Sequence, residues 1–341
     1  MSADKILITG GAGFLGSHLC ERLVERGTNV VVMDNLSTGS LRNLGCLEGH
    51  PNFEFIEGDV LDTDSVSEAI QDCDTVLHLA ASRDVRLSAH DTKIDFEQNL
   101  VGTHTLLESV KNSQRCRRIV FTSTSAVYGE PNIIPTPETY GPLQPLSLYG
   151  ASKLGCEGMI SAYSHLFGID AIICRLANIV GPRCDHGIVH DLMTRVLKGE
   201  GQLDVLGNGK QSKSYVYVDD FIDALLLLLR RRVKGTNIIN VGSSDSLQVK
   251  DIVSIVKNAA GIKSKPVERY LDHGDGRGWP GDVRTMLLDC NKITSAGWNP
   301  SYSSALAIEA TATGLSALLK SQQSSQEFLP QSSDNMEQTA E

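Results

Sequence analysis

Short apolar runs alternate with segments of helical spacing along the first half of the chain. The runs, rich in β-branched residues, lie at 5–9, 30–33, 53–56, 75–79, 118–121 and 171–176. Leu15, Leu19 and Leu23 recur every four residues, and further helices are expected near 64–70, 96–110 and 149–167. Strands that alternate with helices in this way build a parallel sheet covered on both faces. The pattern predicts an α/β fold with a doubly wound parallel sheet.

The regular alternation ends near residue 183. Beyond it, helices are expected at about 188–198, 219–232 and 249–260, and strands at 215–218 and 238–241. We predict a smaller C-terminal α/β substrate domain over the sheet edge, with the substrate cleft between the two parts. The expected division is 1–180, with later segments returning to it, and 181–320. Residues 321–341 are mainly Ser, Gln and Glu, so a disordered tail is expected there.

The composition is that of an ordinary globular enzyme, with 41% of the 341 residues hydrophobic and 21% charged. The formal net charge of -10 disfavours binding to nucleic acid or to anionic membranes. No signal peptide precedes the first strand, and the apolar run at 224–229 is too short to span a bilayer. The eight cysteines are scattered without a Cys-x-x-Cys pair, which is typical of reduced thiols. We therefore expect a cytoplasmic protein that binds neither membranes nor nucleic acid.

A glycine-rich turn follows the first strand. Gly10, Gly13 and Gly16 stand between this strand and the first helix. Such glycines give a tight turn, room for a pyrophosphate against bare backbone, and close packing of helix on strand. The helix N-terminus offers unpaired N–H groups and the positive end of its dipole to the phosphates. Glycine trios alone are weak signals, but the flanking strand and helix favour a dinucleotide site here.

Asp34 ends the second strand, 18 residues after Gly16 (34 − 16). A carboxylate at this place can hold the adenosine ribose of a dinucleotide. It would repel a 2′-phosphate, and no Arg or Lys follows it before Arg42. The pattern therefore favours NAD over NADP, against the alternative that Asp34 only caps a turn.

Other polar and small residues follow the predicted strands. Asp59, Ala80 and Ala81 come directly after the third and fourth strands, and the hydroxyl residues 122–125 follow the fifth. The carboxyl ends of parallel strands form one edge of the sheet, where ligands bind. Asn99 falls early in a helical pattern, and periodicity alone does not distinguish it from a solvent-facing residue.

Tyr149 and Lys153 stand four residues apart in a predicted helix, so they share one face. A proton-transfer site is one interpretation, and a surface pair on an ordinary helix is the other. Cys184, His186 and His190 form a cluster of residue types that bind metals, but no fourth ligand is evident, and we expect no metal.

These motifs occur in the order and spacing of one family. They are Gly10-x-x-Gly13-x-x-Gly16, Asp34, Asp59-Val60, Leu79-Ala-Ala81, Thr122 to Gly129, Tyr149-x-x-x-Lys153 and Arg175-x-x-Asn178. From about residue 5 to 319 the chain resembles the extended short-chain dehydrogenases/reductases that act on nucleotide sugars, most closely the UDP-glucose 4-epimerases. The resemblance implies a Rossmann domain with NAD, a UDP-hexose substrate and a homodimer.

The resemblance also implies roles for particular residues. Tyr149 is then the base, Lys153 its electrostatic partner and a ribose ligand, and Thr124 the hydroxyl that bonds the reacting sugar oxygen. Free tyrosine titrates near pH 10, so ionisation at neutral pH needs about 4 kcal/mol. An adjacent ammonium and the cationic nicotinamide can supply it. The implied cofactor contacts are Gly10, Gly13, Phe14, Leu15, Gly16, Asp34, Asn35, Asp59, Val60, Leu79, Ala80, Ala81, Asn99, Thr122, Tyr149 and Lys153.

Ser125 and Ala126, which follow Thr124, separate the reactions within this family. In nucleotide-sugar 4,6-dehydratases the sequence at this place is similar to Thr-Asp-Glu, because these enzymes need an acid and a base to eliminate water. UDP-glucuronate decarboxylases usually keep a Glu at the place of residue 126. The chain lacks these carboxyls, so 4-epimerisation of a UDP-glucose/UDP-galactose type sugar is favoured. A UDP-glucuronate or UDP-N-acetylglucosamine epimerase, a reductase, a decarboxylase and a non-catalytic NAD-binding protein are the alternatives.

On the substrate side, Asn178, Lys213 and Arg277 match or replace the family's ligands. Lys213 stands where the family usually has Arg, so it keeps the charge but loses the bidentate fork. Arg277 departs from the commonest spacing, and an ordinary surface Arg is the alternative. The epimerised sugar stays open, and residues 83–88 and 188–192 are candidates for selecting it. For a homodimer built on the helices flanking the fifth strand, Leu100, Leu106 and Leu107 are candidate contacts.

Overall fold

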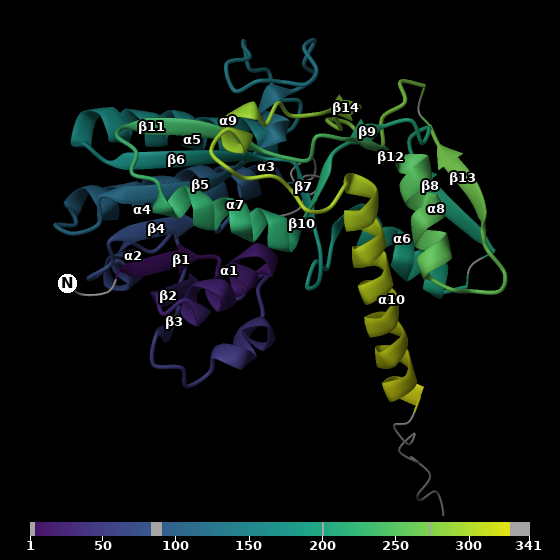
Figure 1. Ribbon diagram of the computed structural model, residues 1–341, viewed down its shortest axis with the longest axis horizontal. Coiled ribbons are helices and arrows are strands. Elements are labelled where there is room, and N and C mark those ends of the chain that lie inside the picture. Colours follow the sequence, from purple (N-terminus) through teal and green to yellow (C-terminus); the bar gives the residue numbers. More distant parts are fainter. Residues whose placement is uncertain (1–3, 83–90, 200, 273, 328–341) are drawn as a thin grey trace, which may run out of the picture.

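The computed structural model describes residues 4–82, 91–199, 201–272 and 274–327, in a larger and a smaller part (Figure 1). The larger part is built on a seven-stranded sheet with the order β11-β6-β5-β4-β1-β2-β3, in which every neighbouring pair is parallel. The doubly wound parallel sheet is thereby confirmed. Its strands are β1 (Lys5–Thr9), β2 (Asn29–Asp34), β3 (Phe53–Glu57), β4 (Thr75–His78), β5 (Arg118–Thr124), β6 (Asp170–Leu176) and β11 (Thr236–Val241).

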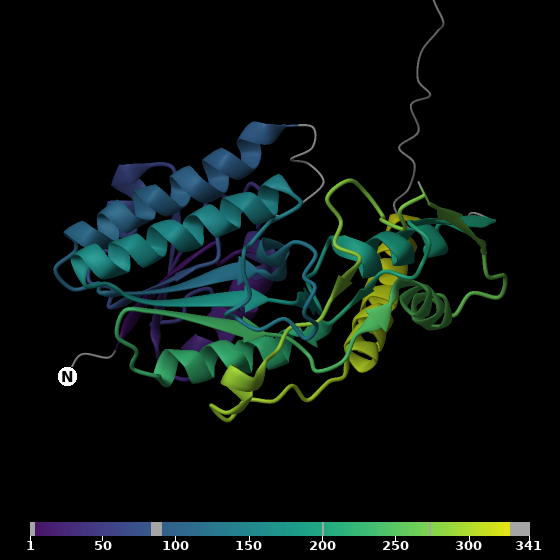
Figure 2. The same ribbon diagram turned by 90° about the horizontal axis from the view of Figure 1, so that it is seen from above.

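Helices cover both faces of the sheet (Figure 2). One face carries α1 (Phe14–Glu25), η1 (Leu41–Leu47), α7 (Val218–Arg230) and α9 (Asn291–Thr294), and the other carries α2 (Thr63–Ala69), α4 (Gly102–Asn112) and α5 (Leu148–Phe167). Along β1, Ile6 and Ile8 belong to the core under the first face, whereas Leu7 belongs to the core under the second. Because successive side chains point to opposite faces, a strand buried on both sides is apolar throughout. The continuous apolar runs of the sequence have this origin.

Between β4 and α4 the chain forms two short elements, α3 (Thr92–Asp95) and η3 (Phe96–Val101). The second is a π-helix, whereas the sequence predicted one regular helix over 96–110. Short π-helical turns inside helices are frequent at functional sites, because they rotate side chains out of the regular pattern. Asp95 and Asn99 are buried at this turn.

The smaller part packs three helices against short strands. The helices are α6 (Gly187–Leu197), α8 (Val249–Ala259) and α10 (Ser304–Glu327). The strand pairs are β7 (Asn178–Val180) with β10 (Tyr215–Tyr217), β8 (Gln202–Leu206) with β13 (Val267–Leu271), and β9 (Ser212–Lys213) with both β12 (Leu247–Gln248) and β14 (Thr285–Met286). Its own apolar core includes Val189, Leu192, Ile252, Val256 and Ile308. β7 follows β6 directly, so it carries the chain from the sheet into this part (Figure 1).

The subunit contact expected at two leucines is wrong. Leu106 and Leu107 are fully buried in the core under α4, so neither can form a subunit contact, and Leu100 packs against the same core. Periodicity shows which residues share a face, but not whether that face meets the sheet or a partner. The tail expected to be disordered is 321–341; its residues 321–327 belong to α10, and residues 328–341 lie outside the described residues. Gln, Glu and Ser reduce the stability of a helix only slightly, so a helix that is already stabilised by packing can extend through them.

In the described part of the chain, no helix is both long and apolar enough to cross a membrane.

Candidate active site and dinucleotide groove

The glycine turn after β1 is shaped by close backbone contacts. Gly10 has a φ of +73°, and a Cβ there would lie 2.7 Å from the backbone nitrogen of Ala80. A Cβ on Gly16 would lie 2.3 Å from the carbonyl oxygen of Gly10. Both distances are far below van der Waals contact, so a side chain at either position would push the turn away from β4 or from α1. The observed contacts therefore agree with the roles predicted for these two glycines, which are a tight turn and close packing of helix on strand.

The N-terminus of α1 faces the same turn. Gly13 is its N-cap, makes no side-chain hydrogen bond to the helix, and no acidic residue stands in the first turn. The first N–H groups of a helix have no partner within it, and the helix dipole makes this end positive. A phosphate group would satisfy both, as expected for a dinucleotide site.

Asp34 is fixed at the carboxyl end of β2. Its Oδ2 accepts a hydrogen bond from the N–H of Ala12 at 2.9 Å, and its Oδ1 accepts one from Leu36 at 2.9 Å. Burial raises the pKa of this carboxyl, while the two backbone donors lower it. Each carboxylate oxygen has a second lone pair, so ribose hydroxyl groups can still bind. Asp34 does cap a turn, and this is compatible with the ribose role.

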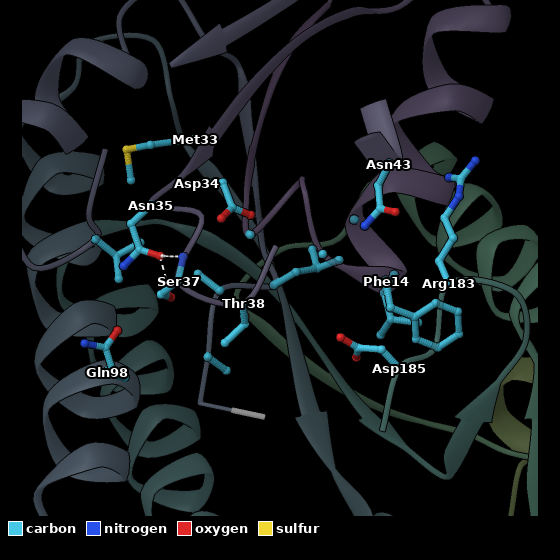
Figure 3. A pocket seen from close by; sticks show the side chains of 18 of the residues that line it. Phe14, Met33, Asp34, Asn35, Ser37, Thr38, Asn43, Gln98, Arg183 and Asp185 are labelled. Atoms are coloured by element: carbon cyan, nitrogen blue, oxygen red, sulfur yellow. Dashed lines mark hydrogen bonds between the residues drawn. The ribbon is translucent and has the colours of Figure 1, made fainter. Parts of the chain in front are cut away.

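A groove runs over the turn and the neighbouring strand ends. Figure 3 shows Asp34, Asn35 and Ser37 along one side of it and Phe14, Arg183 and Asp185 along the other. Asp59 is not among the lining residues, but its Oδ2 accepts a hydrogen bond from Nδ2 of the lining residue Asn35 at 2.8 Å. The residues expected to hold the cofactor that line this groove are Gly10, Gly13, Phe14, Leu15, Gly16, Asp34, Asn35, Val60, Leu79, Ala80 and Ala81.

Arg183 is a groove residue that the sequence did not single out. Its guanidinium donates to Glu21 Oε1 at 2.6 Å and to Ser17 Oγ at 3.1 Å, both on α1. The Gly-Pro-Arg ending of the 178–183 motif was the available signal. Arg183 connects the smaller part of the molecule to the helix that begins at the glycine turn.

Asn99 is buried, and its side chain forms hydrogen bonds with other residues of the protein. It is 1% exposed, and its Oδ1 accepts a hydrogen bond from the N–H of Ser82 at 2.9 Å. Both of its amide hydrogens are engaged, since Nδ2 donates to Ser82 Oγ at 3.1 Å and to Ser152 Oγ at 2.8 Å. Asn99 therefore joins the loop after β4 to α5, one residue before Lys153. The geometry favours a positioning role over the direct cofactor contact that we expected.

Tyr149 and Lys153 do not form a surface pair. Lys153 is 2% exposed, and its Nζ donates to the carbonyl oxygen of Thr122 at 3.0 Å. The same Nζ lies 4.6 Å from the ring centroid of Phe121 and 6.0 Å from that of Tyr149. Burial lowers the pKa of Lys153 to about 8. Burying an ammonium group costs desolvation free energy, so a buried lysine with a shifted pKa indicates a functional site.

The pKa of Tyr149 lies above its ordinary value in the chain by itself. Burial is the largest cause, and the negative charge of Asp95 adds to it. The sequence predicted the opposite direction, because it included two cations and did not place Asp95 nearby. Asp95 comes from the π-helical turn; its Oδ1 accepts a hydrogen bond from Ser82 Oγ, and its Oδ2 is buried without a partner.

Thr124 is the last residue of β5 and meets the start of α5. Its Oγ1 accepts a hydrogen bond from the N–H of Ala126 at 3.1 Å and caps η4 (Ser125–Tyr128). This leaves the hydroxyl hydrogen free to donate. A Cβ on Gly150 would lie 2.9 Å from the carbonyl oxygen of Ala126, so α5 packs directly on η4 at the residue after Tyr149. The fold thus brings the segments that carry Thr124 and Tyr149 together.

A buried ion pair holds α5 on the sheet. Glu157 of α5 and Arg175 of β6 lie 2.7 Å apart, with side chains 5% and 3% exposed. Ser123 Oγ also donates to Glu157 Oε1 at 2.5 Å, next to Arg175 in the strand register. No pattern in the sequence pairs Glu157 with Arg175, because charged residues inside apolar patterns have no periodic partner.

The three predicted substrate residues lie in the smaller part or at its border. Asn178 begins β7, is exposed, and donates from Nδ2 to the carbonyl oxygen of Ser214 at 3.3 Å. Lys213 Nζ lies 2.6 Å from Asp282 Oδ1. Arg277 pairs with Glu130 at 2.7 Å and with Asp275 at 3.1 Å, and Glu130 also pairs with Arg284 at 2.8 Å.

Of the residues expected to select the sugar, 188–192 lie on α6, and 83–88 lie outside the described residues. Over the described ranges, no three His, Cys, Asp or Glu side chains gather to hold a metal ion.

Comparison with known proteins gives consistent matches. The NAD dependent epimerase/dehydratase family matches residues 6–242. The putative UDP-glucose 4-epimerase of Methanocaldococcus jannaschii is 33% identical over 301 residues, which cover 86% of this chain and 93% of that protein. UDP-glucuronic acid decarboxylase 3 of Arabidopsis thaliana is 34% identical over 307 residues, 87% of this chain and 84% of that protein. The solved structure of a UDP-galactose 4-epimerase has a TM-score of 0.81 at 37% identity and covers 92% of this chain and 99% of that one.

Proposed function

The chain belongs to the NAD-dependent epimerase/dehydratase family, and from that premise we propose that it is an NAD-dependent UDP-sugar 4-epimerase that interconverts UDP-glucose and UDP-galactose. The observation that carries the proposal is the reaction site: Lys153 is buried beside Tyr149, while Ser125 and Ala126 provide no carboxyl after Thr124. Such a site supports removal and return of one proton. It does not support elimination of water, which needs both an acid and a base.

The groove fits NAD in its chemistry. The uncapped N-terminus of α1 suits a diphosphate, and Asp34 suits a ribose whose 2′-hydroxyl is free. When bound, NAD accepts a hydride from the sugar and returns it. Asp34 would hold the adenosine ribose, and Asp59 and Val60 would hold the adenine ring. Lys153 would hold the ribose next to the nicotinamide. We assign NAD binding to residues 1–180 with the segments that return to the sheet, and substrate binding mainly to 181–320.

Tyr149 takes the proton from the sugar hydroxyl at C4 and gives it back on the same oxygen. Thr124, whose hydroxyl hydrogen is not used within the protein, donates to that oxygen and holds it near Tyr149. Lys153 stays fixed by the carbonyl of Thr122, so its charge acts on Tyr149 without leaving its place. Between the two proton transfers the 4-keto sugar must turn over in the cleft. The sugar is therefore held loosely, and the nucleotide carries the binding energy.

We also propose a cytoplasmic location, where its eight thiols stay reduced, and a homodimer. Leu106 and Leu107 are excluded from the contact, but Leu166 and Phe167 near the end of α5 are 68% and 40% exposed. A dimer through α4 and α5 would cover them. Light scattering of the purified protein gives the mass, and Leu166→Glu should shift a dimer to monomers.

The test is conversion of UDP-galactose to UDP-glucose by the NAD-loaded protein without added reductant. We expect turnover, no net change in nicotinamide absorbance, and a loss of at least about a thousandfold in Tyr149→Phe, because general-base catalysis is removed. Tyr163→Phe is the matched control. It removes a hydroxyl from the same helix that bonds Glu108 and not the site, so turnover should persist. Undiminished conversion in Tyr149→Phe would contradict the proposal.

A second candidate is decarboxylation of UDP-glucuronate, which the 34% identical Arabidopsis decarboxylase favours. It predicts release of CO₂ and a pentose product from UDP-glucuronate. Product analysis over UDP-glucose, UDP-galactose, UDP-N-acetylglucosamine and UDP-glucuronate separates it from epimerisation.

A further inference from the structure

The segment between β7 and α6 lies along one side of the dinucleotide groove. We call residues 182–186 of this segment the strap. Arg183, Asp185 and His186 of the strap line the groove, and Figure 3 shows Arg183 and Asp185 on the side opposite Asn35. A dinucleotide in the groove would therefore lie between the end of the sheet and the strap, and it could leave when the strap moves away.

Contacts with α1 hold the strap in place. Arg183 donates from Nη1 to Ser17 Oγ at 3.1 Å and from Nη2 to Glu21 Oε1 at 2.6 Å. His18 Nε2 lies 3.0 Å from the carbonyl oxygen of Pro182, which can only accept a hydrogen bond. Ser17 and His18 each stand about one turn before Glu21, so the three side chains lie on one side of α1. The strap is thus held by the same helix whose N-terminus is open to the phosphates.

An ion pair between Arg183 and Glu21 is part of this attachment. The two side chains are 28% and 23% exposed, so salt and water screen the pair less than they screen a pair on an open surface. Glu21 Oε1 also accepts a hydrogen bond from Cys46 Sγ at 2.9 Å, so η1 helps to hold the carboxylate in position. Arg183 has a φ of +68°, in the left-handed region that favours glycine. An arginine in this conformation indicates that its guanidinium is needed at α1.

The proposed reaction requires a cofactor that stays bound from one hydride transfer to the next. The hydride taken from the sugar must return to the same sugar molecule. Loss of the reduced cofactor between the two transfers would leave a 4-keto sugar that cannot be converted to product. Slow release of the cofactor is therefore part of this chemistry, and a groove whose two sides are held together would provide it.

We propose that Arg183 and Glu21 hold the strap over the dinucleotide groove and thereby keep NAD bound through the reaction cycle. Both are positioning residues, because they act by holding the strap and not on the reacting atoms. The inference rests on the proposed function, since it names what retains the cofactor of that reaction.

The rate of cofactor release tests this proposal. The protein is loaded with NADH, excess NAD is added, and the fall of nicotinamide fluorescence gives the release rate. Arg183→Met and Glu21→Gln should each speed release about tenfold, the effect expected when a hydrogen bond to a charged group is lost. Arg22→Met is the matched control, because Arg22 also stands on α1 but pairs with Asp223 of α7, at 3.3 Å. Its release rate should equal that of the wild type.

A double variant separates the holding of the strap from charge repulsion. Without Arg183 the negative charge of Glu21 would remain on α1 near the phosphates, and this charge alone could speed release. If holding the strap is the cause, Arg183→Met combined with Glu21→Gln releases NADH about as fast as either single variant. A double variant that returns to the wild-type rate, or a Glu21→Gln variant that releases NADH no faster than the wild type, would overturn the proposal.

The remaining outcomes separate this inference from the proposed function, because release is measured without any sugar. Equal acceleration in Arg22→Met would overturn the inference, since the cause would be a general loosening of α1. Glu21→Gln keeps the shape of its side chain, so it decides the matter if Arg183→Met does not fold. Epimerisation by the wild type with unchanged NADH release in Arg183→Met contradicts this inference alone. A wild type that retains NADH and does not epimerise UDP-galactose contradicts the proposed function alone.

Discussion

Gly150→Ala should slow turnover without removing any catalytic group. The added Cβ would lie 2.9 Å from the carbonyl oxygen of Ala126 and 3.1 Å from Pro145 Cβ. Ordinary contact begins near 3.4 Å, so the start of α5 must move by about 0.5 Å (3.4 − 2.9) away from η4. Tyr149 is the preceding residue and Thr124 caps η4, so this motion widens the gap between the two groups. A misplacement of about 1 Å can cost a hundredfold, and we therefore expect kcat to fall about tenfold.

Stability separates this effect from a general change in the helix. Alanine is favoured over glycine inside a helix by about 1 kcal/mol, but overpacking costs about 1–3 kcal/mol. The net effect of Gly150→Ala on the free energy of unfolding is therefore between about zero and a loss of about 2 kcal/mol. Gly158→Ala is the matched control on the same helix, since a Cβ there meets nothing within 4 Å. It should stabilise the protein by about 1 kcal/mol and leave kcat unchanged.

Steady-state epimerisation and thermal unfolding of the wild type and both variants decide the matter. A kcat of Gly150→Ala within twofold of the wild type would refute the reasoning, because the contact with η4 would then not set the position of Tyr149. A similar fall of kcat in both variants would also refute it, since the cause would be helix rigidity.

Two further predictions concern titratable groups. Asp95→Asn should move the acid limb of the pH profile of kcat to lower pH, because burial first and the Asp95 charge second raise the pKa of Tyr149. An acid limb that stays in place would show that the charge of Asp95 does not reach Tyr149. His78, fully buried between two threonines, has a pKa lowered by burial to about 3, so below its ordinary pKa of 6.5 the unfolded chain binds a proton that the folded chain does not. The stabilising contribution of His78 is therefore present above pH 6.5, and it falls by about 3 kcal/mol by pH 4. Chemical unfolding should show that the free energy of unfolding depends less steeply on pH in His78→Asn than in the wild type. An equally steep dependence in both proteins would contradict this prediction.

The parts of the fold that the sequence predicted well are those encoded by local physics. The expected strand at 5–9 is β1, and the helix expected at 149–167 is α5, because apolar runs, glycine turns and helical spacing are local features. Asp34 could also be proposed this way, since it stands at a fixed offset from the glycine turn. The spacing of Tyr149 and Lys153 left a surface pair open, and only the resemblance to a family gave Lys153 a role.

The parts that could not be predicted depend on contacts between distant segments. Lys213 and Asp282 are 69 residues apart, and the strands β9, β12 and β14 have two residues each, too few for any period. The π-helical turn that buries Asn99 reads as ordinary helix in the sequence. The sequence also could not show whether Leu106 and Leu107 are buried in the core or contact a second subunit, because either arrangement requires the same apolar face on the helix.

Asp95 bears directly on the argument against an eliminating enzyme. That argument rested on positions 125 and 126, and a carboxyl from another segment could replace the missing acid. Asp95 does lie close enough for its charge to raise the pKa of Tyr149. However, it is 1% exposed, one oxygen accepts the hydrogen bond of Ser82, and the other is buried, so neither oxygen can reach a sugar hydroxyl. Asp95 therefore acts on Tyr149 through its field and not on a substrate by contact, and the inference from Ser125 and Ala126 to epimerisation keeps its force.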